Sequence, residues 1–147
     1  MTSTEISEKT AAELEIIQAT HRYARGLDRF DPEEALSAFA EDAVWDATPV
    51  GLERFAGREQ IRAFFERDAD AIACQFHIIT NHVIEFDAGD RAHGTNYVFS
   101  EGQTKSGAKF KAVALNEDTY VATPDGWLIA SRVISALTPP ELDGFDA

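Results

Sequence analysis

The chain has 147 residues, with 13 basic and 26 acidic side chains and a formal net charge of −13 at pH 7. Its length suits one domain with a substantial core, and a hydrophobic fraction of 44% is typical of a globular protein rather than a disordered one. Nucleic acids and anionic membranes bind basic surfaces, so this charge disfavours both as partners. We therefore expect a single domain over residues 1–147.

The N-terminus and the single cysteine suit a cytoplasmic protein. The first ten residues lack the basic region and apolar run of a signal peptide. No run approaches the roughly 18 apolar residues of a membrane-spanning helix. Cys74 is the only cysteine, so an intramolecular disulfide is impossible, and we expect a buried, inert thiol.

Periodic apolar residues predict three helices in the first half of the chain. Gly26 and Pro32 supply stop signals for the first helix, Asp31 can cap the second, and the third follows Gly57. The stripe of the first helix, at steps of three and four residues, is Leu14, Ile17, His21, Ala24 and Asp28. The expected helices are residues 9–27, 31–40 and 58–71, with residues 1–8 frayed, a strand over 43–47 and a loop over 48–56.

The second half is rich in β-branched and aromatic residues, which predicts long strands joined by glycine-containing turns. Helices followed by a strand meander indicate an α+β domain, with helices on one face of a curved antiparallel sheet. Long strands must twist and coil, so the sheet should form a cone around a cavity. The expected strands are residues 74–86, 91–104, 109–123 and 127–137, followed by an acidic tail.

Four segments resemble the SnoaL-like group of the NTF2-like superfamily. They are IIQATHRYARGLDRFDPEEALSAFAEDAVWD (16–46), FAGREQIRAFF (55–65), FHIITNHVIEFDAGDRAHGTNYV (76–98) and NEDTYVATPDGWLIASRVI (116–134). The resemblance covers residues 12–137. It implies a cone-shaped α+β barrel, in which three N-terminal helices pack against a curved antiparallel sheet and a deep pocket lies between them. The group includes dehydratases, a dehydrochlorinase, ketosteroid isomerase, polyketide cyclases and small subunits of ring-hydroxylating dioxygenases.

The resemblance also implies site residues. In the dehydratase and dehydrochlorinase branch, an Asp at the end of the first helix pairs with a His on the strand after the third helix. Asp28 and His77 occupy the matching places. Tyr23 matches a polar residue one turn earlier, and Arg132 matches an arginine of the last strand. A neutral imidazole can remove a proton from carbon while a carboxylate stabilises the resulting imidazolium. Tyr23 could then assist a leaving hydroxyl, and Arg132 could stabilise developing negative charge.

Pattern alone leaves alternatives open for these residues. Asp28 ends an apolar stripe, where a carboxylate needs a partner, but it could equally be a helix-end residue beside Arg29. Strand alternation puts His77 on a mixed face, whereas the rival His82 shares the more apolar face. The resemblance favours His77, because its H-x-x-x-N spacing is similar to that of the branch with the His–Asp pair. His21 is expected at the core or the pocket edge, and His93 on a strand surface.

Further side chains could line the cavity. Asparagine is disfavoured inside strands, so a place in the pocket is plausible for Asn96 and Asn116, which both lie within predicted strands. Asp46 could instead serve a turn, and the aromatic residues could be core. No motif indicates a metal or a cofactor, so we expect neither. The proposed substrate-binding residues are Trp45, Asp46, Phe64, Asn96 and Asn116.

The function expected from the resemblance is a cofactor-independent lyase or isomerase, with dehydration of a small, largely apolar cyclic molecule as the first choice. The second hypothesis is a non-catalytic binding protein or an accessory subunit of an oxygenase. An epoxide hydrolase is third, because no convincing Asp–Arg–Asp set is found. We expect a homodimer, with a trimer as second choice, joined through outer sheet faces that carry Val113, Leu115 and Val121.

Overall fold

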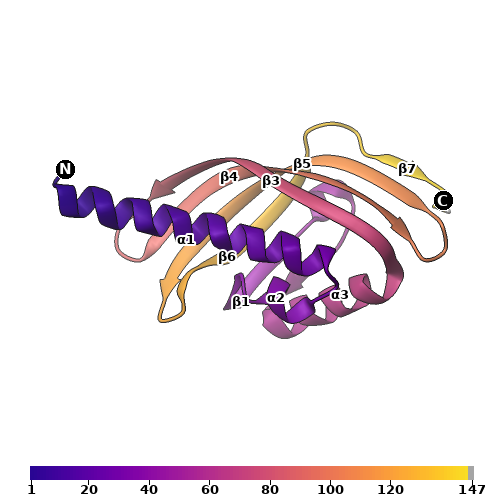
Figure 1. Ribbon diagram of the computed structural model, residues 1–147, viewed down its shortest axis with the longest axis horizontal. Helices are drawn as coiled ribbons and strands as arrows, with labels where there is room; N and C mark the ends of the chain where they lie inside the picture. The colour runs from indigo at the N-terminus through magenta and orange to yellow at the C-terminus, as the bar shows by residue number, and fades with distance from the viewer. Residues whose placement is uncertain (146–147) are drawn as a thin grey trace.

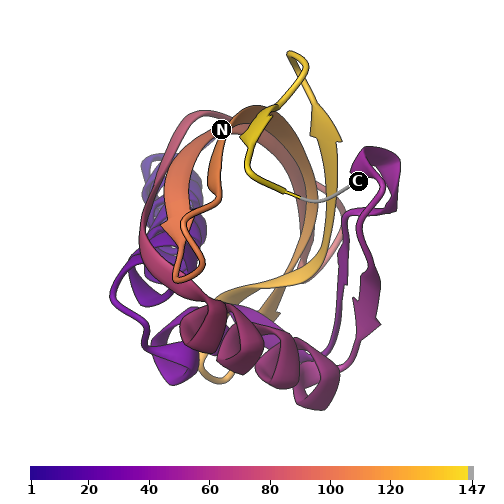
Figure 2. The ribbon, with the colours of Figure 1, turned by 90° about the vertical axis from the view of Figure 1, so that its right-hand side faces the viewer.

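The computed structural model describes residues 1–145, in which three α-helices cover a long curved sheet (Figure 1). Figure 2 looks along the sheet and shows how strongly it curls. The helices are α1 (Ser3–Asp28), α2 (Pro32–Leu36) and α3 (Arg58–Ala71), with a 3-10 turn η1 (Thr48–Val50). The strands are β1 (Phe39–Asp46), β2 (Arg54–Ala56), β3 (Ile72–Phe86), β4 (Arg91–Thr104), β5 (Lys109–Thr123), β6 (Gly126–Ala136) and β7 (Glu141–Asp143).

The sheet confirms the expected α+β class. Its strand order is β2-β1-β6-β5-β4-β3, and β7 pairs with β5. Strands β3 to β6 form the predicted antiparallel meander, whereas β1 joins β6 in parallel, so the sheet is mixed. The sheet does not close into a full barrel, because β2 and β3 are its two edges. No helix within residues 1–145 is long and apolar enough to cross a membrane.

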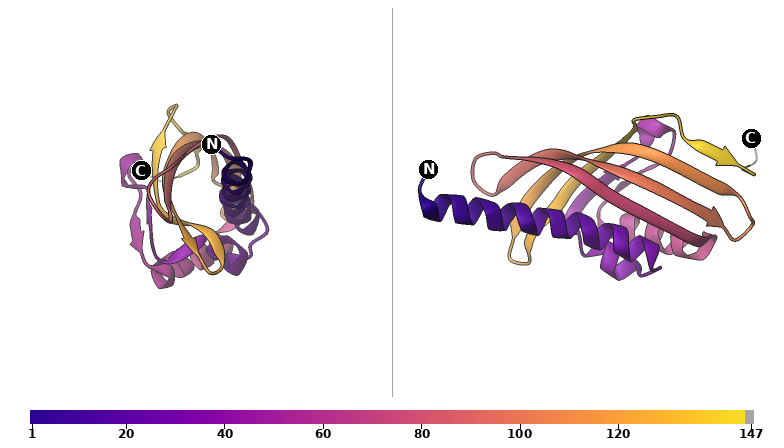
Figure 3. Two further views of the ribbon diagram at one scale, coloured as in Figure 1. Left: turned by 90° about the vertical axis from the view of Figure 1, so that its left-hand side faces the viewer. Right: turned by 45° about the horizontal axis from the view of Figure 1, so that its top comes forward.

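Helix α1 begins six residues earlier than expected, because its start is capped. The Thr2 hydroxyl accepts from the Glu5 amide at 3.1 Å, and the Glu5 carboxylate accepts from the Thr2 amide at 2.6 Å. This reciprocal capping box satisfies two of the free amide groups of the first turn. The first turns of α1 are exposed and extend beyond the sheet (Figure 3), and burial begins at Ala12.

Helix α2 is shorter than expected, and β1 starts earlier. The Ser37 hydroxyl donates to the Glu34 carbonyl at 2.6 Å and ends the helix. The Ala38 carbonyl then accepts from the Ile129 amide at 2.8 Å, so the chain has already joined β6 where helix was predicted. The sequence also missed β2 and β7, which have three residues each and are too short for a recognisable alternation.

A bulge in β3 resolves the question of which histidine faces the helices. Asn81 has φ of 58°, and the register between β3 and β4 shifts between Thr80 and Val83. A one-residue bulge reverses the alternation of the strand. His77 therefore faces α1 before the bulge, and His82 faces α1 after it.

The core lies between α1, α3 and the inner face of the sheet. Its fully buried residues include Ile16 and Ala19 of α1, Phe65 of α3 and Ile129 of β6. The outer face of the sheet is less covered and carries Val113, Leu115 and Val121 as expected. Assembly through this face remains a prediction.

The expectation of a buried cysteine is wrong. Cys74 is exposed, because it lies on β3 beside the inward-facing Gln75 and therefore points away from the helices. Its thiol has no place in the core.

Candidate active site

The centre of the candidate site is a hydrogen-bonded pair between the last residue of α1 and the inner face of β3. Asp28 Oδ1 lies 2.7 Å from Nδ1 of His77, and Asp28 Oδ2 accepts from the His77 backbone amide at 3.0 Å. Both side chains are half-buried, with 24% of Asp28 and 15% of His77 exposed. Two contacts to one carboxylate fix the orientation of the imidazole.

The same contact assigns the tautomer of His77. A carboxylate only accepts hydrogen bonds, so Nδ1 carries the proton of the neutral ring and Nε2 carries the lone pair. Within residues 1–145, Nε2 has no hydrogen-bond partner. The ring therefore presents a free base whose other side is held by Asp28.

Tyr23 lies one helical turn before Asp28, beside the imidazole. The two ring centroids are 6.3 Å apart, and the Tyr23 hydroxyl accepts from Nε1 of Trp45 at 3.2 Å. Burial raises the pKa of Tyr23, outweighing the opposing effects of Arg132 and Trp45, so the phenol stays protonated at neutral pH. It retains a proton that it can donate.

Arg132 is completely buried and paired with a residue that the sequence reasoning missed. Its Nε and Nη2 atoms donate to the Asp118 carboxylate at 2.8 and 2.9 Å. Burial alone would lower the pKa of Arg132, but the charge and hydrogen bonds of Asp118 raise it, so the guanidinium stays charged. The guanidinium also lies 4.7 Å from the centre of the Tyr23 ring.

Asp118 is the centre of a wider buried network. Its Oδ2 atom accepts from the Tyr120 hydroxyl at 2.8 Å and from Nδ2 of Asn96 at 2.8 Å. Asn116 in turn donates to Oδ1 of Asn96 at 2.8 Å. Burial and the negative charge of Asp118 raise the pKa of Tyr120, so its hydroxyl remains a donor. The network therefore stabilises the carboxylate from three directions.

Two buried polar atoms near this network are left without a partner in residues 1–145. They are Nη1 of Arg132, a donor, and Oδ1 of Asn116, an acceptor. Unsatisfied groups of this kind are rare in protein interiors and call for a water or a ligand. Asn96 and Asn116 are buried polar residues of the inner face, and their substrate-binding role stays a prediction.

The other proposed substrate-binding residues have different surroundings. Trp45 is buried and packs against the half-buried Phe64 in a tilted arrangement, with ring centroids 4.6 Å apart. Phe64 also stacks on Phe55, with ring centroids 4.8 Å apart. Asp46 accepts from both the amide and the hydroxyl of Thr48, which lowers its pKa. Asp46 therefore holds the turn into η1, the alternative that the sequence left open.

His82 is part of a second contact with α1. Its Nε2 lies 2.9 Å from the Thr20 hydroxyl, which donates to the Ile17 carbonyl at 2.8 Å. Because that hydroxyl proton is used, Nε2 of His82 is the donor. Burial, with help from His21 and Arg132, lowers the pKa of His82 to about 4, so it is neutral at pH 7.

The remaining histidines lie outside the candidate site. His21 is exposed, and its ring centroid lies 6.3 Å from that of His82 in an edge-to-face arrangement. The expected core position is therefore wrong, and His21 only borders the contact between His82 and α1. His93 is on the outer surface as expected, where Asp87 and Glu85 contact it and raise its pKa.

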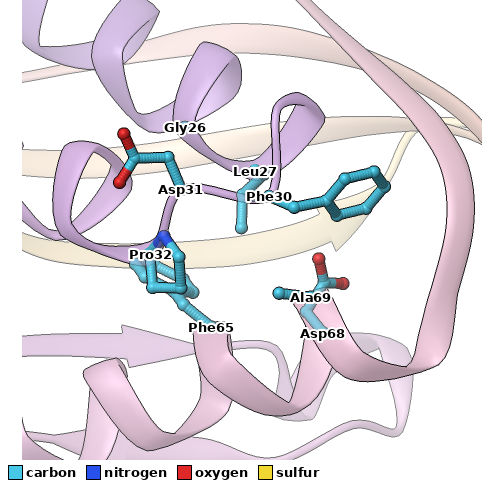
Figure 4. A pocket seen from close by; sticks show the side chains of 8 residues that line it. All are labelled: Gly26, Leu27, Phe30, Asp31, Pro32, Phe65, Asp68 and Ala69. Atoms are coloured by element: carbon cyan, nitrogen blue, oxygen red, sulfur yellow. The ribbon is translucent and has the colours of Figure 1, made fainter.

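Two hollows on the surface of residues 1–145 bear on the location of a site. A shallow crevice follows the end of α1 (Figure 4) and is lined by Gly26, Leu27, Phe30, Asp31, Pro32, Phe65, Asp68 and Ala69. A groove of about 480 Å³ crosses the outer face of the sheet, between Val83 of β3 and Val133 of β6. Only the crevice adjoins the end of α1 that carries Asp28.

The helical cover and the curved sheet agree with the family to which the sequence assigns the chain. Residues 8–133 match the SnoaL-like domain family, so the chain belongs to that family. No curated protein sequence matches the chain.

Solved structures agree with the fold. A candidate aromatic ring hydroxylase from Novosphingobium aromaticivorans has a TM-score of 0.86 and 27% identity, over 90% of this chain and 94% of that one. A candidate scytalone dehydratase from the same organism has a TM-score of 0.81 and 21% identity, over 100% and 94%. A hexachlorocyclohexane dehydrochlorinase, LinA, has a TM-score of 0.78 and 17% identity, over 99% and 97%. The last two likenesses show the fold alone.

Proposed function

We propose that the protein is a cofactor-independent lyase or isomerase, and that it dehydrates a small, largely apolar cyclic molecule. The observation that carries this proposal is the 2.7 Å contact between Asp28 and Nδ1 of His77, which places the proton of the neutral ring on Nδ1 and leaves the lone pair of Nε2 without a partner in residues 1–145. A base oriented in this way and only 15% exposed is suited to removing a proton from carbon.

The proposed elimination uses the imidazole first as a base and then as an acid. Nε2 of His77 takes the proton from the carbon next to a substrate carbonyl. The electrons of that C–H bond form a C=C bond, and the hydroxyl on the next carbon departs with the electrons of the C–O bond. The imidazolium returns its proton to the departing hydroxide, which becomes water, either directly or through the Tyr23 hydroxyl, which gives its own proton and takes that of the imidazolium. Asp28 stabilises the imidazolium while it exists.

The buried arginine would favour the same step electrostatically. Proton removal next to a carbonyl places negative charge on the carbonyl oxygen, and Nη1 of Arg132 is a buried donor without a partner in residues 1–145. Oδ1 of Asn116 is a matching acceptor, suited to a substrate hydroxyl. Arg132 has a single carboxylate partner among the described residues, Asp118, so the Asp–Arg–Asp set of an epoxide hydrolase is not formed around it.

The names of two structural relatives are consistent with this chemistry. One is a candidate dehydratase and the other a dehydrochlorinase, and both names describe eliminations. At 21% and 17% identity, they support the choice of reaction and leave the substrate to be found.

The test begins with turnover of cyclic alcohols and β-hydroxy ketones, followed by ultraviolet absorbance of the conjugated product. With any compound that is turned over, His77→Ala is expected to lower kcat at least about 100-fold. His93→Ala, which removes an exposed histidine of the outer face, is the matched control and should retain full activity. Wild-type turnover by a folded His77→Ala protein would reject the proposal.

A non-catalytic role is the second candidate, because the relative with 27% identity is named as a candidate aromatic ring hydroxylase. A binding protein or oxygenase subunit would bind aromatic compounds without consuming them. Calorimetric titration with the compounds of the same panel distinguishes the two. Binding that is equal in wild type and His77→Ala, with no turnover of any compound, supports the second candidate.

The oligomeric state is a separate proposal. A homodimer through the outer sheet face, or a trimer as second choice, would cover Val113, Leu115 and Val121. Light scattering after size-exclusion chromatography measures the mass directly. Val113→Lys should produce monomers, since it places a charge on that face.

A further inference from the structure

Gln75 joins three elements around the candidate site. It lies two residues before His77 on the inner face of β3, and its side-chain amide donates two hydrogen bonds. One reaches the Leu27 carbonyl in the last turn of α1 at 2.9 Å, and the other reaches Oδ2 of Asp68 in α3 at 2.7 Å. Both partners are acceptors, so the orientation of the amide is settled by its surroundings.

Gln75 and His77 bind two neighbouring residues at the end of α1. Leu27 is bound through its carbonyl, and the next residue, Asp28, is bound through its carboxylate. Carbonyls of the last helical turn lack regular helical partners, and the Leu27 carbonyl otherwise accepts from the Arg29 amide and, at 3.2 Å, from the Phe30 amide. Gln75 therefore fixes the backbone from which the Asp28 side chain projects.

Asp68 anchors the other side of the amide. Figure 4 shows Asp68 on α3 facing the segment that carries Leu27 and Phe30. Burial raises the pKa of Asp68, an effect opposed by the Gln75 hydrogen bond and the nearby His77 and strengthened by Asp28. An Asp held in a half-buried position beside a second carboxylate needs such a donor.

We propose that Gln75 is a positioning residue of the candidate active site, and that Asp68 holds it in place. Its amide ties the end of α1 to β3 and α3, so that the Asp28 carboxylate meets Nδ1 of His77 at hydrogen-bonding distance. This inference rests on the proposed function of the Asp28–His77 pair. A displacement of about 1 Å in such a pair can lower a rate about 100-fold.

The test uses Gln75→Leu, which keeps the volume and removes both hydrogen bonds. With a compound turned over by the wild type, kcat should fall about ten- to 100-fold while KM stays within about threefold. A second measurement needs no substrate. The Nδ1 proton of His77 should give a downfield proton resonance, identified by its absence in His77→Ala, and Gln75→Leu should weaken or abolish it.

If Gln75→Leu does not fold, two variants of Asp68 test the same proposal. Asp68→Leu removes one of the two anchors and should also lower kcat. Asp68→Asn keeps an oxygen acceptor for Gln75 and should retain kcat within about threefold. Arg62→Ala is the control for general loosening of α3, because it removes the exposed 2.8 Å contact with Glu33, which involves neither Gln75 nor the Asp28–His77 pair, and it should leave kcat unchanged.

The outcomes separate this inference from the proposed function. If His77→Ala lowers kcat but the Gln75→Leu and Asp68→Leu variants that fold keep wild-type kcat and the downfield resonance, Gln75 has no positioning role. If His77→Ala itself keeps wild-type turnover, the proposed function fails first. Loss of the resonance in Gln75→Leu, with its retention in Arg62→Ala, supports positioning even before a substrate is known.

Discussion

Two of the polar groups beneath α1 differ in burial and in the number of hydrogen bonds that their carboxylate accepts from other side chains. Around Asp118, the side chains of Arg132, Tyr120 and Asn96 are buried, and the carboxylate accepts from all three. The Asp28–His77 pair is half-buried and leaves one ring nitrogen free within residues 1–145. The first arrangement holds charge in place, and the second leaves a base available.

The difference shows how burial separates two uses of the same residue types. A buried ion pair contributes little net stability, but removal of one partner leaves the other charge without compensation. A half-buried pair has a smaller structural cost and can change its protonation state. Asp118 should therefore matter most to folding, and Asp28 most to turnover.

The largest expected effect on stability comes from Asp118→Ala. It leaves the buried guanidinium of Arg132 without its carboxylate and should lower the free energy of unfolding by about 3–5 kcal/mol, measured by urea denaturation. The double variant Asp118→Leu/Arg132→Met removes both charges and should recover most of that loss. A loss below about 1 kcal/mol in Asp118→Ala would show that the buried pair behaves like a surface pair.

Asp28→Asn is expected to show the opposite balance. The amide cannot balance the charge of an imidazolium, so kcat on a substrate from the screen should fall about 100-fold or more. The free energy of unfolding should change by only about 1 kcal/mol, because the site is half-buried and asparagine still accepts one hydrogen bond. If Asp28→Asn lowers the free energy of unfolding as much as Asp118→Ala does, the proposed division between a structural pair and a catalytic pair is wrong.

A smaller effect is expected at the bulge that lets both histidines face α1. Asn81 has φ of 58°, a conformation that a β-branched residue adopts only with strain. Asn81→Val should cost about 1–2 kcal/mol in unfolding free energy, whereas Asn81→Gly should be close to neutral. Equal stability of the two variants would mean that the bulge moves without cost.

The smallest expected effect concerns His82 and pH. Its pKa is about 4 in the folded protein, against about 6.5 for an ordinary histidine. Between these values the unfolded chain binds more protons, so this residue lowers stability as the pH falls from 6.5 to 4. His82→Gln keeps a donor for Thr20 and cannot titrate there. As the pH falls from 6.5 to 4, the Tm of this variant should fall by a few °C less than that of wild type. Identical curves of Tm against pH would contradict the lowered pKa of His82.

The sequence predicted the fold where long elements carry a clear pattern. Helix α3 and the four long strands have bounds within about two residues of those expected. The start of α1 was missed, because the polar residues 1–8 were interpreted as frayed. Thr2 and Glu5 nevertheless have the spacing of a capping box. β7 depends on a contact with β5 that local sequence does not encode.

The candidate site was predicted in part. Family resemblance placed Asp28 and His77, and their contact is present. Asp118 was missed, although Asn116, Asp118 and Tyr120 alternate along β5 and therefore share one face. The inward position of His82 could not be predicted together with that of His77, because regular alternation places the two on opposite faces and only the bulge at Asn81 brings them to the same one.

The C-terminus of α1 has an electrostatic effect on His77 beyond the contact with Asp28. Aligned peptide dipoles place roughly half a negative charge at the C-terminus of a helix, and α1 has 26 residues with His77 at that end. A positive imidazolium on His77 would thus lie in the negative end of this field as well as beside a carboxylate. The helix that covers the sheet would in this way also favour the charge that proton transfer creates.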